Sequence, residues 1–160
     1  MKKNDGTFKS EQELMLQAER YCAGSEHSVW QVSTKLQEWG AESQDVVERI
    51  ISRLIKENYI DQLRFAHAVV HDKLMFNKWG RIKIRFYLKN QKIDESTINK
   101  AMEQIEEKEY MDILKSVISG KNKSLKEKDK RLRAAKLMRS VVQCGFEPEL
   151  VRSFVQLSQD

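Results

Sequence analysis

Seven lysines and arginines lie between positions 73 and 92, and no acidic residue stands among them. Five of the seven are spaced by three or four residues, so on a helix they would share one face. Like charges at this spacing repel one another, and an anionic partner would relieve the repulsion. We therefore predict that the segment binds acidic protein or phosphate groups, the alternative being a solvated helix face. The seven are Lys73, Lys78, Arg81, Lys83, Arg85, Lys89 and Lys92, and the five that share the predicted face are Lys78, Arg81, Arg85, Lys89 and Lys92.

Two apolar residues, Ile82 and Phe86, lie beside this basic face on the helical wheel. Exposed apolar groups within a basic surface favour a protein partner over bare phosphate, whereas a helix buried on two sides would explain them as packing. A second basic stretch runs from Lys121 to Arg139, and it either extends the same surface or forms a solvated connection and helix face. Its predicted binding residues are Lys126, Lys130, Arg133 and Lys136.

The sequence lacks the patterns of nucleotide-binding and metal enzymes. Its six glycines are isolated, so neither G-x-G-x-x-G nor a P-loop occurs. His67 and His71 have the spacing of shared metal ligands, but no H-E-x-x-H motif or third ligand at a telling distance accompanies them. Cys22 and Cys144 fit neither a disulfide framework nor a metal site. We therefore expect no enzymatic activity, no bound metal and no cofactor.

Composition and charge give the fold class and place the contact surface. The 160-residue chain is 40% apolar and 33% charged, with one proline, and its lack of alternating β-branched runs predicts an all-α fold. It has no apolar run of 18 residues and no apolar stretch after its basic N-terminus, so we expect a cytoplasmic protein without membrane contact. Residues 1–72 carry nine basic and twelve acidic side chains, whereas residues 73–160 carry twenty and twelve. This asymmetry places the predicted anion-binding surface in the second part of the chain.

Apolar residues recur in three copies, at shifts of 52 and then 53 residues. Spacings of 4, 5, 5 and 4 within each copy predict a helix, a short turn and a second helix, with Gly40, Lys92 and Gly145 at the helix-ending position. A further helix precedes each pair, and its start is predicted to recur at Tyr59 and Tyr110. The aligned apolar sets are Val32, Ile84 and Leu137; Leu36, Leu88 and Val141; Ala41, Ile93 and Phe146; Val46, Ile98 and Val151; and Ile50, Met102 and Val155.

The predicted architecture is three tandem three-helix repeats, helix-turn-helix-like, stacked into an elongated curved array. A flexible N-terminus covers residues 1–9, and the repeats cover residues 10–60, 61–109 and 110–160. A helical bundle in which similar helix lengths produce an accidental match is the alternative.

The central repeat resembles the RecX family, the regulators of the RecA recombinase. The family's pattern is an acidic residue, Arg-aromatic-Ala, a basic residue, a Gly-containing helix start, basic-Ile, Leu and an apolar turn residue. Lys92 stands where the family commonly has Gly, and Val69 where it often has an aromatic residue. The residues that match are Asp61, Arg64, Phe65, Ala66, Lys73, Trp79, Gly80, Lys83, Ile84, Leu88 and Ile93.

The resemblance implies a non-enzymatic modulator of RecA, acting in recombination, DNA repair and the SOS response. Similar proteins bind along the groove of the RecA filament on single-stranded DNA and limit strand exchange, ATP hydrolysis and co-protease activity. We expect a monomer whose partner is the RecA filament. Two alternatives remain, a sequence-nonspecific nucleic-acid binder that acts without RecA, and a structural adaptor for another helical partner.

Overall fold

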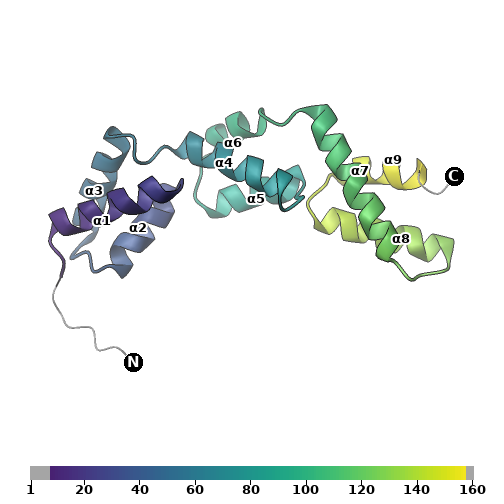
Figure 1. Cartoon of the computed structure of the whole chain (residues 1–160), viewed down its shortest axis with the longest axis horizontal. Coiled ribbons are helices and arrows are strands. Elements are labelled where there is room, and N and C mark those ends of the chain that lie inside the picture. The colour runs from purple at the N-terminus through teal and green to yellow at the C-terminus, as the bar shows by residue number, and fades with distance from the viewer. Residues whose placement is uncertain (1–7, 158–160) are drawn as a thin grey trace, which may run out of the picture. The chain divides into compact units, whose positions relative to one another are not determined.

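The computed structural model describes residues 8–157, which form nine helices and no strand (Figure 1). The predicted all-α fold is confirmed. None of the nine is both long enough and apolar enough to cross a membrane. The flexible N-terminus expected over residues 1–9 lies mostly outside the described residues. The helices are α1 (Glu11–Gly24), α2 (Val29–Glu38), α3 (Gln44–Lys56), α4 (Gln62–Met75), α5 (Arg81–Asn90), α6 (Glu95–Met102), α7 (Glu107–Ser124), α8 (Lys130–Gln143) and α9 (Pro148–Leu157).

Short polar side chains fix where many of these helices begin. Ser10 and Ser28 each accept a hydrogen bond from a backbone N–H in the first turn, and the residue three positions later bonds back to the cap, which forms a capping box. Ser43, Asp94 and Asp129 begin α3, α6 and α8 in the simpler one-way form. These local signals satisfy backbone donors that a helix leaves without partners at its N-terminus.

The repeated apolar positions form the cores of the helix groups. Thirteen of the fifteen aligned residues are buried, and the other two, Ala41 and Met102, are partly buried. In the first group, α1, α2 and α3 pack pairwise around a core that includes Val32, Leu36 and Ile50. In the later part of the chain, α5 packs on α6, and α7, α8 and α9 pack against one another.

The turn that follows the middle helix of each copy has the same backbone conformation. Gly40 has φ 97°, Lys92 has φ 60° and Gly145 has φ 96°, so all three residues occupy the left-handed region. The predicted helix-ending position is therefore confirmed in every copy. Lys92 adopts this conformation with a Cβ atom, which costs roughly 1 kcal/mol relative to glycine.

The predicted start of the helix that precedes each pair is wrong. Tyr59 lies ahead of α4, whereas Tyr110 lies within the first turn and a half of α7. The residues that occupy equivalent positions in the three helices are Leu14, Phe65 and Tyr110. Each is the fourth residue of its helix, and its N–H donates to the carbonyl of the residue just before the helix. The error arose because two Tyr-x-Asp segments match in sequence while occupying different turns of their helices.

The chain divides into two compact units. The first extends to Phe65 and includes Gln91–Ile93, and the second comprises Ala66–Asn90 and the chain from Asp94 onward. The predicted boundary after residue 109 falls inside α7, which begins at Glu107. The grouping into three tandem repeats and their curved stacking stay predictions.

Candidate partner-binding face of helix α5

The predicted five-residue basic face is interrupted at both ends. Helix α5 spans Arg81–Asn90, so only Arg81, Arg85 and Lys89 lie on it. Lys78 precedes the helix with φ 57°, and Lys92 follows it with φ 60°. A residue in the left-handed region cannot continue a right-handed helix. The single helical face predicted from Lys78 to Lys92 is therefore wrong as a description of the backbone, although the central three residues do share a face.

One acidic side chain from another helix, Glu95, pairs with two of these three cations. The Arg85 guanidinium donates to Glu95 Oε1 at 3.1 Å and to Asn99 Oδ1 at 2.8 Å. Lys89 Nζ lies 3.6 Å from the second oxygen of Glu95. Glu95 belongs to α6, beyond the acid-free segment, so the sequence run alone did not show that this surface has mixed charge. More than half of the Lys89 side chain is exposed, so its charge remains accessible to a partner.

Arg81 stabilises the packing of α5 against α7 and the start of α9. Its guanidinium carbon lies 3.8 Å from the centre of the Tyr110 ring. The same guanidinium is 2.5 Å from Glu107 and 3.5 Å from Glu147. Because Arg81 stacks on an aromatic ring and pairs with two carboxylates, its main role is to stabilise the fold and not to bind a partner. Charge reversal of Arg81 is therefore expected to destabilise the fold.

The Tyr110 hydroxyl joins the same elements. It accepts the Arg81 backbone N–H at 3.1 Å and donates to the Glu147 carboxylate at 2.9 Å. Burial raises the pKa of Tyr110 far above its usual value, so the hydroxyl keeps its proton and can act as donor at any physiological pH.

Two glycines allow the start of α5 to lie directly against the turn between α8 and α9. The Gly80 N–H donates to the Cys144 carbonyl at 2.8 Å, and the Ile82 N–H donates to the Gly145 carbonyl at 3.0 Å. A Cβ atom at Gly80 would lie 2.3 Å from the Gly145 carbonyl carbon, and one at Gly145 would lie 2.3 Å from Lys83 Cβ. Both glycines are pattern positions in the sequence, but no sequence pattern predicts that they contact each other.

Two more of the predicted lysines flank an aromatic ring on the other side of α5. Lys73 Nζ and Lys83 Nζ lie 4.7 and 4.4 Å from the centre of the Trp79 ring. Lys73 is also 4.9 Å from the Tyr87 ring, and the two rings meet at a tilted angle with centres 5.9 Å apart. Cation–π contacts leave the positive charge in place while holding it at a defined point.

The outward face of α5 is an apolar ridge. Ile82 is 52% exposed and Phe86 is 64% exposed, which shows that the helix is not buried on two sides. Beside the ridge lies an open groove of about 450 Å³. The groove is lined by Arg81, Ile82, Arg85, Phe86, Lys89, Met102 and Glu147. Exposed aromatic and aliphatic groups next to arginine are typical of a protein-binding surface.

The second predicted basic surface contains one clearly structural residue. Arg133 donates to the carbonyls of Asn122, Leu125 and Glu127, and its Nε donates to the Asn122 side chain. Lys136 Nζ pairs with Glu127 at 2.8 Å. Lys126 and Lys130 are exposed and have no ion-pair partner within residues 8–157.

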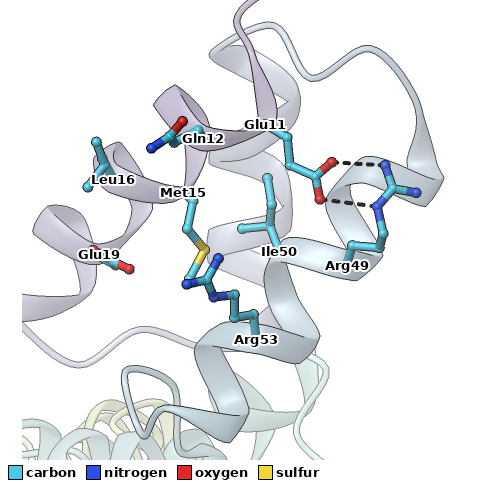
Figure 2. Close-up of a pocket in the computed structure, with 8 residues that line it drawn as sticks. All are labelled: Glu11, Gln12, Met15, Leu16, Glu19, Arg49, Ile50 and Arg53. Atoms are coloured by element: carbon cyan, nitrogen blue, oxygen red, sulfur yellow. Dashed lines mark hydrogen bonds and ion pairs between the residues drawn. The ribbon is translucent and has the colours of Figure 1, made fainter.

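The remaining cavity and histidines offer few groups for catalysis or metal binding within the described residues. A cavity of about 370 Å³ lies between α1 and α3, and Figure 2 shows the Glu11 carboxylate facing the Arg49 guanidinium across its edge. The two groups form paired hydrogen bonds of 3.1 and 3.0 Å. His67 contacts Gln104, His71 contacts Asp72, and residues 8–157 hold no cluster of three or more candidate metal ligands. The cavity is lined by Glu11, Gln12, Met15, Leu16, Glu19, Arg49, Ile50 and Arg53, which include no serine, threonine, cysteine, lysine or histidine.

A family model described as RecX, second three-helix domain, matches residues 61–102, the segment that includes α4, α5 and α6. The regulatory protein RecX of Vibrio parahaemolyticus is 29% identical over 106 residues, which cover 66% of this chain and 66% of that protein. The regulatory protein RecX of Clostridium tetani is 30% identical over 125 residues, which cover 77% of this chain and 56% of that protein. The chain is therefore similar to RecX regulatory proteins.

The fold of this chain is also found in solved structures. A crystal structure of RecX from Lactobacillus salivarius superimposes with a TM-score of 0.80 at 18% identity, over 91% of this chain and 94% of that one. The crystal structure of a regulatory protein RecX gives a TM-score of 0.83 at 19% identity, over 90% and 72% of the two chains. The chain spans 66% and 56% of the lengths of the two curated relatives.

Proposed function

We propose that this protein is a non-enzymatic modulator, and specifically an inhibitor, of the RecA recombinase, acting on the RecA filament formed on single-stranded DNA. The resemblance to the RecX family implies regulation of RecA, and the similarity to relatives that are named regulatory proteins supports a regulatory role. The single structural observation that carries the proposal is the exposed face of α5, where Ile82 and Phe86 stand beside basic side chains and a groove.

The α5 face suits an acidic protein surface with an apolar anchor point. Ile82 and Phe86 would lose their exposed area to the partner, and burying apolar area contributes most of the binding energy at such interfaces. Lys89 and Arg85 would set the orientation, because charged groups at an interface rim mainly steer and select the partner. A protein held across neighbouring RecA subunits would slow their ATPase cycling or compete with incoming DNA.

The test is the single-stranded-DNA-dependent ATPase rate of the cognate RecA at increasing concentrations of this protein. Binding to the same DNA without RecA is measured in parallel. We expect the ATPase rate to fall at protein concentrations well below those that coat bare DNA. If the rate falls only where bare DNA is already saturated, the effect is competition for DNA and the RecA proposal is refuted.

A double variant tests the assignment of the α5 face. Ile82→Ala with Phe86→Ala removes two exposed apolar side chains, and a loss of about 1 to 2 kcal/mol at each anchor corresponds to at least a tenfold weaker inhibition. The matched control is Ile55→Ala with Phe76→Ala, which removes the same groups from exposed positions on α3 and after α4. Equal inhibition by the two double variants would show that the α5 face is not the contact surface.

A further inference from the structure

The connection between α7 and α8 presents a second cationic surface of a different kind. Helix α7 ends at Ser124 and α8 begins at Lys130, with extended backbone at both Leu125 and Asp129. Five cations along this stretch are exposed, and none has an ion-pair partner in the described part of the chain. They are Lys123, Lys126, Lys128, Lys130 and Arg131. We refer to these five residues as the connection cations.

Both acidic residues of the connection are occupied by other groups. Glu127 pairs with Lys136 at 2.8 Å, and the Lys136 ammonium holds the pKa of this carboxyl below its usual range. Asp129 accepts the Leu132 N–H at 2.9 Å and so caps α8. Lys136 neutralises Glu127, so the charge of Asp129 alone opposes the five connection cations, whose field stays positive.

Arg133 holds the backbone that carries these cations. Its guanidinium donates to the Leu125 carbonyl at 2.9 Å and to the Glu127 carbonyl at 2.8 Å, and it also bonds to Asn122. An arginine that binds two carbonyls of the connection and one in the last turn of α7 fixes the shape of that connection before a partner arrives. Less conformational entropy is then lost on binding.

The composition of this surface favours phosphate over protein. No aromatic residue occurs between positions 121 and 139, and Leu132 is the exposed large apolar residue there. Lysine is depleted at protein interfaces and aromatic residues are enriched, so this surface is the opposite of the α5 face. In addition, the first turn of α8 carries Lys130 and Arg131, whose charges oppose the positive end of the helix dipole and are offset there by a single carboxylate, the Asp129 cap. A bound anion would relieve that repulsion.

We propose that the connection cations bind the phosphate backbone of a nucleic acid, independently of base sequence. The α5 face would then contact protein, and the connection between α7 and α8 would contact nucleic acid. The inference does not depend on the RecA proposal, because oligonucleotide binding is measured without RecA. Arg133 and Lys136, which the sequence predicted as contacts, instead stabilise the connection. Arg133 donates to its carbonyls, and Lys136 pairs with Glu127.

Fluorescence anisotropy of labelled single-stranded oligothymidylate, titrated with the full chain at several salt concentrations, tests the inference. The variant is Lys126→Gln, Lys128→Gln, Lys130→Gln. Each phosphate contact on a single strand contributes about 0.7 to the slope of log affinity against log salt, so the slope should fall by about 2 and the affinity about 50-fold at 0.15 M salt.

The matched control is Lys56→Gln, Lys100→Gln, Lys108→Gln, which makes the same charge change at exposed lysines on α3, α6 and α7. Its affinity should stay within a few-fold of wild type. Equal losses of oligonucleotide affinity in the two variants would show that only the net charge of the protein matters and would overturn the inference. An unchanged salt slope in the variant of the connection cations would also overturn it. Undiminished oligonucleotide affinity together with lost RecA inhibition would reassign the surface to an acidic protein. Failure of RecA inhibition alone leaves the oligonucleotide result standing, so the two proposals fail separately.

Discussion

Gly40 and Gly145 occupy equivalent turns with nearly the same backbone, but their surroundings differ. Their φ angles are 97° and 96°. A Cβ atom at Gly40 would meet nothing within 4 Å, whereas one at Gly145 would lie 2.3 Å from Lys83 Cβ and 2.7 Å from the Lys83 nitrogen. Gly40→Ala therefore measures the backbone strain alone, and Gly145→Ala measures the strain together with the packing of the α8–α9 turn on α5.

The two costs follow from the geometry. Alanine in the left-handed region lowers the free energy of unfolding by about 1 to 2 kcal/mol at either position. At Gly145 the clash involves the Lys83 backbone, which cannot rotate away, and forced overpacking adds about 1 to 3 kcal/mol. We expect a loss of about 1 to 2 kcal/mol for Gly40→Ala and about 2 to 5 kcal/mol for Gly145→Ala.

Urea unfolding followed by far-ultraviolet circular dichroism measures the global loss, and amide hydrogen exchange locates it. Gly145→Ala should speed exchange at the Gly80 and Ile82 amides, which donate to the carbonyls of this turn. Gly40→Ala should leave both amides protected. Equal losses of stability, with unchanged protection of Ile82 in Gly145→Ala, would refute the close approach of α5 and the turn.

Three other predictions concern single residues. Lys92→Gly should raise the free energy of unfolding by about 0.5 to 1 kcal/mol in urea titrations, because relief of the left-handed strain exceeds the added entropy of the unfolded chain; a loss of stability would contradict the turn geometry. Tyr110→Phe should lower it by about 1 to 3 kcal/mol, since the hydroxyl that joins Arg81 to Glu147 is removed, and unchanged stability would mean that these hydrogen bonds contribute little. The Thr97 N–H holds the pKa of Asp94 below its usual 3.8, so the carboxylate stabilises the fold above that value and ceases to do so as the pH falls through the lowered pKa. Asp94→Asn keeps the cap and should flatten the acid-side decline in thermal stability, and an identical pH profile would argue against this titration.

Much of the fold could be predicted from the sequence because local patterns determine it. The spacing of Val32, Leu36 and Ile50, repeated twice more along the chain, places apolar side chains on one face of each helix, and these faces are buried. The turn positions at Gly40 and Gly145 follow from the same spacing, since a helix that must reverse ends most readily at a glycine. Where a local match had no periodic support, as at Tyr59 and Tyr110, the prediction was wrong.

The candidate site was only partly predictable. That Ile82 and Phe86 share a face with basic residues is a property of the sequence, whereas their exposure depends on which neighbours α5 packs against. The acidic partners of Arg81 could not be predicted from the sequence. Glu107 and Glu147 lie 26 and 66 positions beyond Arg81 in the chain, and only the tertiary structure brings them to it.

Sequence by itself determined the helices, their apolar faces and the uneven distribution of charge, because each of these depends on the side chains of neighbouring residues and on helical periodicity. Tertiary structure decided which charges are free. Arg81 and Arg133 are predicted as binding residues from the sequence. In the folded chain, however, Arg81 donates to the Glu107 carboxylate and Arg133 donates to backbone carbonyls before α8. Lys126, Lys128 and Lys130 are exposed and have no ion-pair partner in the described part of the chain, because the neighbouring acids have other contacts: Glu127 pairs with Lys136 and Asp129 caps α8.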